Sequence, residues 1–269
     1  MTLVGGGCHR MELVMGTAIS VDVRDDDVTP RALDDVFGWF VRVDEVFSPY
    51  KEDSQISRLG RCEISVSECD DDVAWVLEQC EKLRDSTGGY FDAWATGTLD
   101  PSGLVKGWSV ELASAMLVER GSANHCINAG GDIRIRGEPE PGRAWHAGIA
   151  HPLERGALTV VIEGRDLAVA TSGITERGVH VVDPLTGQAA VALASVTVVG
   201  PELVLTDAYA TAALAMGLGA PSWLAGLANH EAYVVDAGGH VWWSEGFPRY
   251  APALATGSSV TPPAGQPRR

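Results

Sequence analysis

Two segments, TSGITERGVHVVDPLTG (171–187) and LTDAYAT (205–211), frame the most informative part of this sequence. Between them lies a β-rich run, Ala192–Val199, which leads into an alanine-rich segment with helical character. Within about forty residues the chain places a polar glycine turn, a histidine beside an Asp-Pro-x-Thr-Gly turn, and an acidic helix start. Hydrogen-bonding groups at this density between apolar strands indicate a functional site, because a hydrophobic core has the opposite composition.

Composition places the chain among globular proteins with a substantial core. Its 269 residues, 45% of them hydrophobic, are enough for one large domain or two small ones. With 36 acidic and 20 basic residues the net charge is −16, and such a surface repels nucleic acids and anionic membranes. An anionic substrate would therefore need local shielding by a metal ion, backbone N–H groups or a few basic side chains.

Cysteine usage and the N-terminal segment bear on location. The five cysteines include no C-x-x-C pair, and their odd number argues against a disulfide framework or a zinc site. The opening segment MTLVGGGC (1–8) is faintly similar to a lipoprotein cleavage site, but no apolar segment precedes Cys8. A cytoplasmic location is therefore expected, with export requiring a start upstream. No run of 18 apolar residues occurs, so no membrane span is expected.

The pattern of apolar residues predicts helices in the first half of the chain and strands in the second. Helical spacing or composition indicates five helices, at Pro30–Phe47, Asp71–Ser86, Gly107–Arg120, Asp207–Leu218 and Pro221–Asn229. Strand-like runs bounded by turn residues cover Leu13–Val23, Asp132–Arg136, Trp145–Ala150, Leu158–Glu163, Leu167–Thr171, Ala192–Val199, Ala232–Val235 and Val241–Ser244. Without repeats or a linker, this pattern favours a single α+β domain over residues 1–254, followed by a disordered tail over residues 255–269.

Asp207 and Thr211 are the candidate metal ligands. They are four residues apart on an expected helix and so share one face, from which a carboxylate and a hydroxyl can both reach a hard cation. In the alternative, Asp207 is the N-cap of this helix and Thr211 is packed as a small residue. The sequence pattern alone leaves both open.

His180 is the candidate base. An imidazole with an ordinary pKa of about 6.5 can take a proton from a hydroxyl, although a histidine in a strand is commonly just packed and hydrogen-bonded. Asp183 is expected to fix the following turn with its side chain rather than to do chemistry.

Two further glycine-containing segments could approach a ligand. Asn128–Asp132 is a glycine turn that enters a strand, where glycine allows either close approach to a ligand or simply a tight turn. Ser102–Gly107 leads into a helix, and its N–H groups with Lys106 could hold a phosphate, but the P-loop spacing is absent. The G-x-S-x-G, G-x-G-x-x-G and H-E-x-x-H patterns are also absent, which disfavours a serine hydrolase, a Rossmann dehydrogenase and a zincin.

The order of these segments along the chain resembles the ApbE family of flavin transferases. The similar blocks span roughly Met15 to Tyr250 and are MGT (15–17), FSPY (47–50), DSQISRL (53–59), GYFD (89–92), DPSGLVKG (100–107), NAGGD (128–132), TSG (171–173), HVVDPLTG (180–187) and TDA (206–208). The histidine block and the TDA block are the most specific of these motifs.

The resemblance implies an α+β ApbE-like domain with mixed or antiparallel sheets packed against helices. It implies a Mg²⁺-dependent enzyme that cleaves the pyrophosphate of FAD and attaches FMN by a phosphoester bond to a threonine or serine of a target flavoprotein. Mg²⁺ would be bound by Asp207, Thr211 and the carbonyl of Gly103, and His180 would be the base for the acceptor hydroxyl. The residues expected to contact FAD are Met15, Ser48, Tyr50, Asp92, Lys106, Ser172, Gly173, His180 and Val181.

The chain also departs from the family pattern. The segment between Phe91 and Asp100 is short, Trp94 stands where a threonine is common, and Pro101-Ser102 replaces a usual Leu-Gly. These differences affect the flavin contacts more than the metal ligands. Hydrolysis of FAD to FMN and AMP, and flavin binding without catalysis, are the alternative functions.

Overall fold

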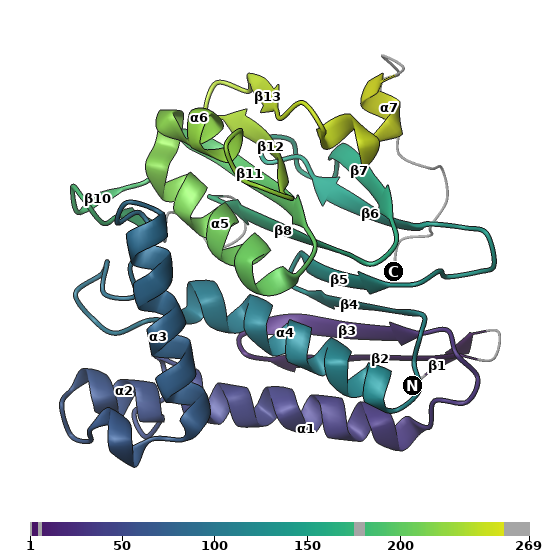
Figure 1. The fold of residues 1–269 in the computed structure, drawn as a ribbon, viewed down its shortest axis with the longest axis horizontal. Coiled ribbons are helices and arrows are strands. Elements are labelled where there is room, and N and C mark those ends of the chain that lie inside the picture. The colour runs from purple at the N-terminus through teal and green to yellow at the C-terminus, as the bar shows by residue number, and fades with distance from the viewer. Residues whose placement is uncertain (1, 5–6, 175–180, 256–269) are drawn as a thin grey trace.

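A long antiparallel sheet forms the centre of the computed structural model, which describes residues 2–4, 7–174 and 181–255. Within these residues the sheet has nine strands in the order β1-β2-β3-β4-β5-β8-β11-β12-β13 (Figure 1). Their bounds are β1 Thr2–Val4, β2 Gly7–Val14, β3 Thr17–Val23, β4 His125–Ala129, β5 Asp132–Arg136, β8 Leu167–Gly173, β11 Leu193–Gly200, β12 Glu231–Asp236 and β13 Val241–Trp243. Two separate hairpins are β6 Trp145–Ala150 with β7 Leu158–Gly164, and β9 Val182–Asp183 with β10 Gln188–Ala189.

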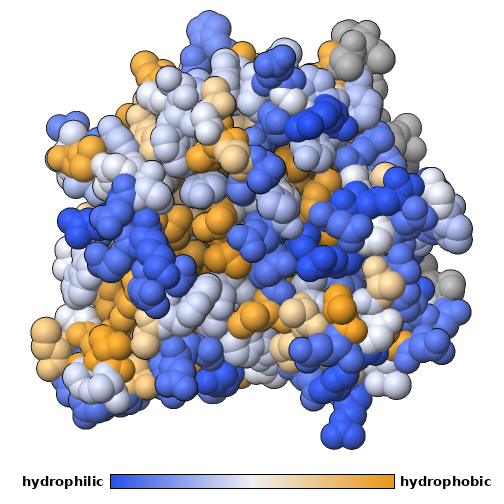
Figure 2. Space-filling model, in the orientation of Figure 1, coloured by the Kyte–Doolittle hydropathy of each residue, from blue (hydrophilic) through white to orange (hydrophobic). Residues whose placement is uncertain are grey.

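The helices are α1 Pro30–Phe47, α2 Gln55–Gly60, α3 Asp71–Ser86, α4 Ser102–Glu119, α5 Leu203–Met216, α6 Ala220–Leu224 and α7 Pro252–Ala255, with the 3₁₀ turns η1 Val66–Glu68, η2 Gly217–Gly219 and η3 Phe247–Arg249. Helices α1, α4, α5 and α6 lie on one face of the sheet (Figure 1), whereas α7 packs on β7 at the opposite face. Helices α4 and α5 pack against each other and contact the central strands, while α1 packs on α4. The surface of this helical side is largely hydrophilic, with smaller groups of apolar residues between the polar ones (Figure 2).

The central strands are apolar on both faces because both faces are covered. Along β8, Ala168 and Ala170 pack under the helices, whereas Leu167 and Val169 pack with the β6–β7 hairpin. All eight residues of β11 are buried. This arrangement explains why β11 is a continuous apolar run instead of an alternating one.

Several elements agree with the sequence pattern to the residue. Helices α1 and α3 and strands β5 and β6 have the expected bounds. The pattern is wrong at Leu13–Val23, which is not one strand but parts of β2 and β3 with a turn at Met15-Gly16 between them. It also misses the strands β1 and β4 and the short elements α2, β9 and β10.

Two helix starts are also corrected. Helix α4 begins at Ser102 instead of Gly107, and the Asp100 carboxylate accepts the Ser102 N–H at 3.0 Å. Helix α5 begins at Leu203, whose N–H donates to Glu111 Oε2 on α4 at 2.7 Å. A start stabilised by a residue so distant in the sequence leaves no local signal.

The stretch Leu203–Leu224, which comprises α5, η2 and α6, is long and apolar enough to cross a membrane by length and composition alone. Since 56% of its apolar window is buried inside the domain and α5 packs on α4 and the sheet, it has the surroundings of a core helix. The expected tail falls almost entirely on residues 256–269, outside the described part of the chain.

Candidate active site

A cavity of about 610 Å³ opens between the helices and the central strands. It is lined by residues from segments that lie far apart in the sequence, including the β2–β3 turn, the start of α4, the β4–β5 turn, the end of β8 and one face of α5. Among its lining residues are the predicted ones Met15, Ser48, Tyr50, Asp92, Gly103, Lys106, Ser172, Gly173, Val181, Asp207 and Thr211. The fold therefore gathers every predicted site residue within the described chain into one cavity.

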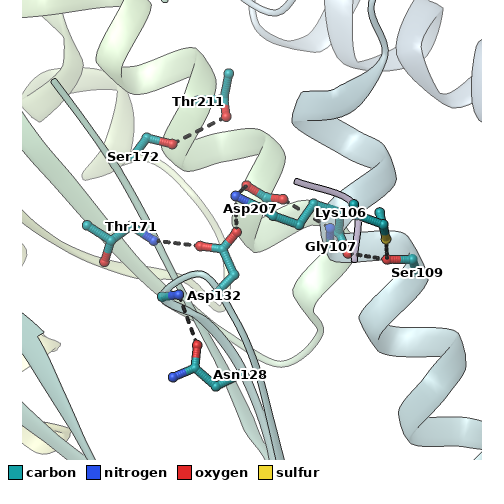
Figure 3. Close-up of polar contacts among 11 residues, drawn as sticks. Lys106, Gly107, Ser109, Asn128, Asp132, Thr171, Ser172, Asp207 and Thr211 are labelled. Carbon is teal, nitrogen blue, oxygen red and sulfur yellow. Dashed lines mark hydrogen bonds and ion pairs between the residues drawn. The ribbon is translucent and has the colours of Figure 1, made fainter. Parts of the chain in front are cut away.

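Asp207 lies in the second turn of α5 and is 1% exposed. The alternative that it is the N-cap is wrong, because α5 begins four residues earlier with Glu202 as its N-cap. Its Oδ2 accepts the backbone N–H of Gly107 on α4 at 3.0 Å (Figure 3). This contact fixes the carboxylate at the place where the two helices cross.

The crossing is close because residue 107 is a glycine. A Cβ added to Gly107 would lie 2.5 Å from the carbonyl oxygen of Leu203 and 2.9 Å from the Cβ of Asp207. A side chain at this position would thus force α4 and α5 apart. Gly107 therefore contributes to the position of Asp207 through its size as well as its N–H.

Thr211 lies one turn beyond Asp207, as its spacing predicts. Its Oγ1 is 3.3 Å from the Oγ of Ser172 on β8 (Figure 3). Gly103 faces it from α4, since a Cβ built there would lie 3.6 Å from Thr211 Oγ1. The three predicted metal-binding positions thus come from two helices and line the same cavity.

Lys106 lies between two buried carboxylates. Its Nζ forms an ion pair with Asp132 Oδ2 and is 3.8 Å from Asp207 Oδ1 (Figure 3). Burial, and secondly the charge of Asp132, raise the pKa of Asp207, while Lys106 and the Gly107 N–H act in the opposite direction. Within this group, one ammonium faces two carboxylates, an arrangement that favours a further cation.

Asp132 is a site residue whose role the sequence pattern does not show. It is fully buried, and its Oδ1 accepts the Thr171 N–H at 3.1 Å, which links the start of β5 to β8. In the preceding turn, Asn128 Oδ1 accepts the N–H of Gly131, as in an ordinary turn. The ordinary-turn alternative is therefore confirmed, and Asn128 and Gly131 also line the cavity.

The β2–β3 turn brings Met15 to the cavity in an uncommon conformation. Met15 has φ 55° and Gly16 has φ 70°, so a non-glycine residue occupies the left-handed region. Its sulfur accepts the Ser109 hydroxyl of α4 at 3.8 Å, and its side chain packs against the core. A strained residue held by such contacts at a cavity wall is typical of binding sites.

The predicted residues at the ends of α1 and α3 lie nearer the surface. Ser48 ends α1, and its carbonyl accepts the Ser54 hydroxyl at 2.7 Å. Tyr50 is 92% exposed although it lines the cavity. The carboxylate of Asp92 accepts the Trp94 N–H at 2.8 Å, which shapes this short connection.

The histidine block is described only in part, because His180 lies outside the described residues. Val181 follows it and lines the cavity. The expected role of Asp183 is confirmed: its carboxylate accepts the N–H of Leu185 at 2.9 Å and the hydroxyl of Thr186 at 2.8 Å, closing the turn.

Fold and cavity together define an α+β ligand-binding protein with an acidic, oxygen-rich site at a helix crossing. The chain belongs to the ApbE family, whose model matches residues 15–97 and 94–235. The expected fold class is confirmed by two solved structures, each covered over 99% of its length by 91% of this chain: the ApbE protein of Thermotoga maritima (TM-score 0.79, 21% identity) and the flavin transferase ApbE of Vibrio cholerae (TM-score 0.78, 22% identity).

Curated relatives match over a shorter part of the sequence. A FAD:protein FMN transferase of Vibrio cholerae is 33% identical over 129 residues, which are 44% of this chain and 39% of that protein. One of Rhodobacter capsulatus is 33% identical over 127 residues, 44% of this chain and 24% of that protein. The aligned part thus spans well under half of the length of either relative.

Proposed function

We propose that this protein is a Mg²⁺-dependent FAD:protein FMN transferase that attaches FMN by a phosphoester bond to a threonine or serine of a target flavoprotein. Relatives that carry the name FAD:protein FMN transferase support the reaction class. The observation that carries the proposal is the convergence of Asp207, Thr211 and Gly103 beside Lys106 in one cavity. Their arrangement suits the binding of a metal and a phosphate together.

The residues present fit Mg²⁺. Mg²⁺ prefers oxygen ligands and is commonly held by one or two carboxylates together with substrate phosphates and water. Asp207, the Thr211 hydroxyl and the Gly103 carbonyl form such a set. It contains a single carboxylate, and the described residues hold no cluster of three or more His, Cys, Asp or Glu side chains suited to a metal. When bound, Mg²⁺ would neutralise charge on the phosphate oxygens.

The charge of the cavity supports the same proposal. Its described lining contains four aspartates and one lysine. This lining would by itself repel an anionic dinucleotide, so binding of the dinucleotide calls for a cation such as Mg²⁺. Lys106, in the second turn of α4, offers its ammonium to the phosphates near the helix N-terminus. The volume of about 610 Å³ lies within the range of ligand cavities.

In the proposed reaction the acceptor hydroxyl oxygen bonds to the phosphorus of the FMN half, and the bond from this phosphorus to the bridging oxygen breaks. AMP leaves with the bridging oxygen. We assign His180 as the base that takes the hydroxyl proton, on the strength of its place in the motif directly before the cavity residue Val181. Lys106 would pair with the reacting phosphate, and Asp207 would hold the Mg²⁺ that neutralises its charge.

Mass spectrometry of the full chain incubated with FAD, Mg²⁺ and an acceptor carrying a D-x-x-[ST]-G-A-[ST]-like segment tests the proposal. An acceptor heavier by the mass of FMN is the expected product. Free FMN and AMP without adduct would show hydrolysis instead, and bound intact FAD would show a non-catalytic binder. For His180→Ala we expect a loss of roughly 10²–10⁴-fold, and an effect below tenfold would reject its role as base.

A further inference from the structure

The β6–β7 turn contributes a histidine to the cavity that none of the family-like motifs contains. His151 directly follows β6 and lines the cavity together with Ala150 and Pro152. This wall belongs to the hairpin, whereas the predicted metal-binding residues belong to α4 and α5. His151 therefore faces a different part of a bound ligand from the part held by Asp207.

Hydrogen bonds in the turn define which ring nitrogen of His151 is available. Its Nδ1 accepts the backbone N–H groups of Leu153 at 3.2 Å and of Glu154 at 3.0 Å. A neutral imidazole that accepts at Nδ1 carries its proton at Nε2. Within the described chain, Nε2 forms no hydrogen bond, so the turn presents an oriented N–H donor at the cavity wall.

The strand leading to His151 has room for a flat group. Ala150 follows the buried Ile149 on β6 and lines the cavity with only a methyl group, while at Gly148 the Leu158 side chain lies against the place where a Cβ would be. A planar ring could lie against this small-residue surface with its edge near the histidine. Heteroaromatic rings of a dinucleotide carry ring nitrogens or carbonyl oxygens, which accept hydrogen bonds along their edges.

We propose that His151 is a ligand-binding residue whose Nε2–H donates a hydrogen bond to an acceptor atom on one heteroaromatic ring of the dinucleotide. This inference rests on the proposed function, since it assigns a contact to the same substrate. The competing explanation is that His151 only stabilises its own turn. The two roles use different nitrogens of one ring, so substitutions can separate them.

Asparagine and glutamine at position 151 make a matched pair. In His151→Asn, the side-chain oxygen can accept the turn N–H groups as Nδ1 does, but no donor reaches the position of Nε2. In His151→Gln, the longer amide restores a donor near that position. We expect His151→Asn to weaken FAD binding about tenfold while its Tm stays near that of the wild type, and His151→Gln to recover most of the affinity.

Calorimetric titration of the full chain with FAD in the presence of Mg²⁺ measures these affinities. His146→Asn is the control, because His146 lies on the same strand, is exposed and pairs with Glu163 at 3.3 Å. Its affinity should equal that of the wild type. Parallel titrations of the wild type and His151→Asn with FMN and with AMP identify the ring. The ligand whose affinity falls in the variant contains the ring that His151 contacts.

The outcomes separate this inference from the proposed function. If the wild-type chain does not bind FAD, the proposed function fails and the inference with it. If the wild type binds FAD and His151→Asn binds it within twofold as well, only the role of His151 is overturned. A lowered Tm and weaker FAD binding in His151→Gln, with both retained in His151→Asn, would assign His151 to the turn and also overturn the proposal.

Discussion

Replacement of Gly107 by alanine tests whether the close crossing of α4 and α5 positions Asp207. The new Cβ would meet the Leu203 carbonyl oxygen at 2.5 Å, and this oxygen belongs to the backbone, so it cannot rotate away. Ordinary van der Waals contact begins at 3.4 Å, so the helices would have to separate by about 0.9 Å. The same movement stretches the 3.0 Å hydrogen bond from Gly107 to Asp207.

Two opposing effects determine the stability of Gly107→Ala. Overpacking of a close contact costs about 1–3 kcal/mol, whereas alanine gains about 0.5–1 kcal/mol over glycine inside a helix. The expected result is a net loss of about 1 kcal/mol, or a Tm lower by about 2–4 °C. Because a displacement of about 1 Å can cost on the order of 100-fold in rate, we expect transfer activity to fall much more than stability.

Gly38→Ala is the matched control, since Gly38 lies inside α1 and an added Cβ would meet nothing within 4 Å. This variant should be more stable than the wild type by about 0.5–1 kcal/mol and fully active. Urea unfolding and FMN-transfer rates would be measured for both variants. If Gly107→Ala gains stability as Gly38→Ala does and keeps its activity, the role assigned to the crossing is wrong.

Three further predictions concern charge and polar contacts. Lys106→Met should lower stability by about 3 kcal/mol by leaving buried carboxylates uncompensated, and urea unfolding should show that adding Asp132→Asn restores most of it. Thr211→Val should weaken Mg²⁺ binding, measured calorimetrically with FAD present, by about tenfold or more without lowering the Tm, because only a 3.3 Å contact to Ser172 is lost. Burial, and secondly the charge of nearby arginines, lowers the pKa of His125 from 6.5 to about 4. Between pH 4 and pH 6.5 His125 is therefore protonated in the unfolded chain but not in the folded one. Stability should be complete above pH 6.5 and fall by about 3 kcal/mol toward pH 4, and urea unfolding of His125→Asn should show a flatter pH profile.

Elements with local signals are the ones that the sequence predicts well. Helix α1 has Leu33, Val36 and Phe40 at helical spacing, and the proline at position 49 marks its end, so the pattern locates both ends. The β2–β3 turn has Met15, not glycine or asparagine, in the left-handed region, so the usual hairpin signal is missing. The start of α5 is stabilised by Glu111 from another helix, which no local pattern can reveal.

The same distinction applies to the candidate site. Asp207 and Thr211 are four residues apart, so the helical repeat alone predicts that they share a face. The contribution of Asp132 cannot be read in this way, because its partners Lys106 and Thr171 become neighbours only when α4, β5 and β8 pack together. His151 likewise acquires significance only when the β6–β7 hairpin is placed at the cavity.

The dependence of the site on packing explains why stability and function are linked at the helix crossing. The N–H that Asp207 accepts belongs to Gly107 on α4, and this contact requires α4 and α5 to cross at close range. Replacing Gly107 by a larger residue therefore changes both the distance between α4 and α5 and the position of Asp207, the proposed metal-binding residue. A buried carboxylate held in this way has exchanged its hydration for one N–H and the distant Lys106 ammonium, which is 3.8 Å away. A bound cation would complete its compensation, so we expect Mg²⁺ and FAD together to raise the Tm of the wild type more than that of Gly107→Ala.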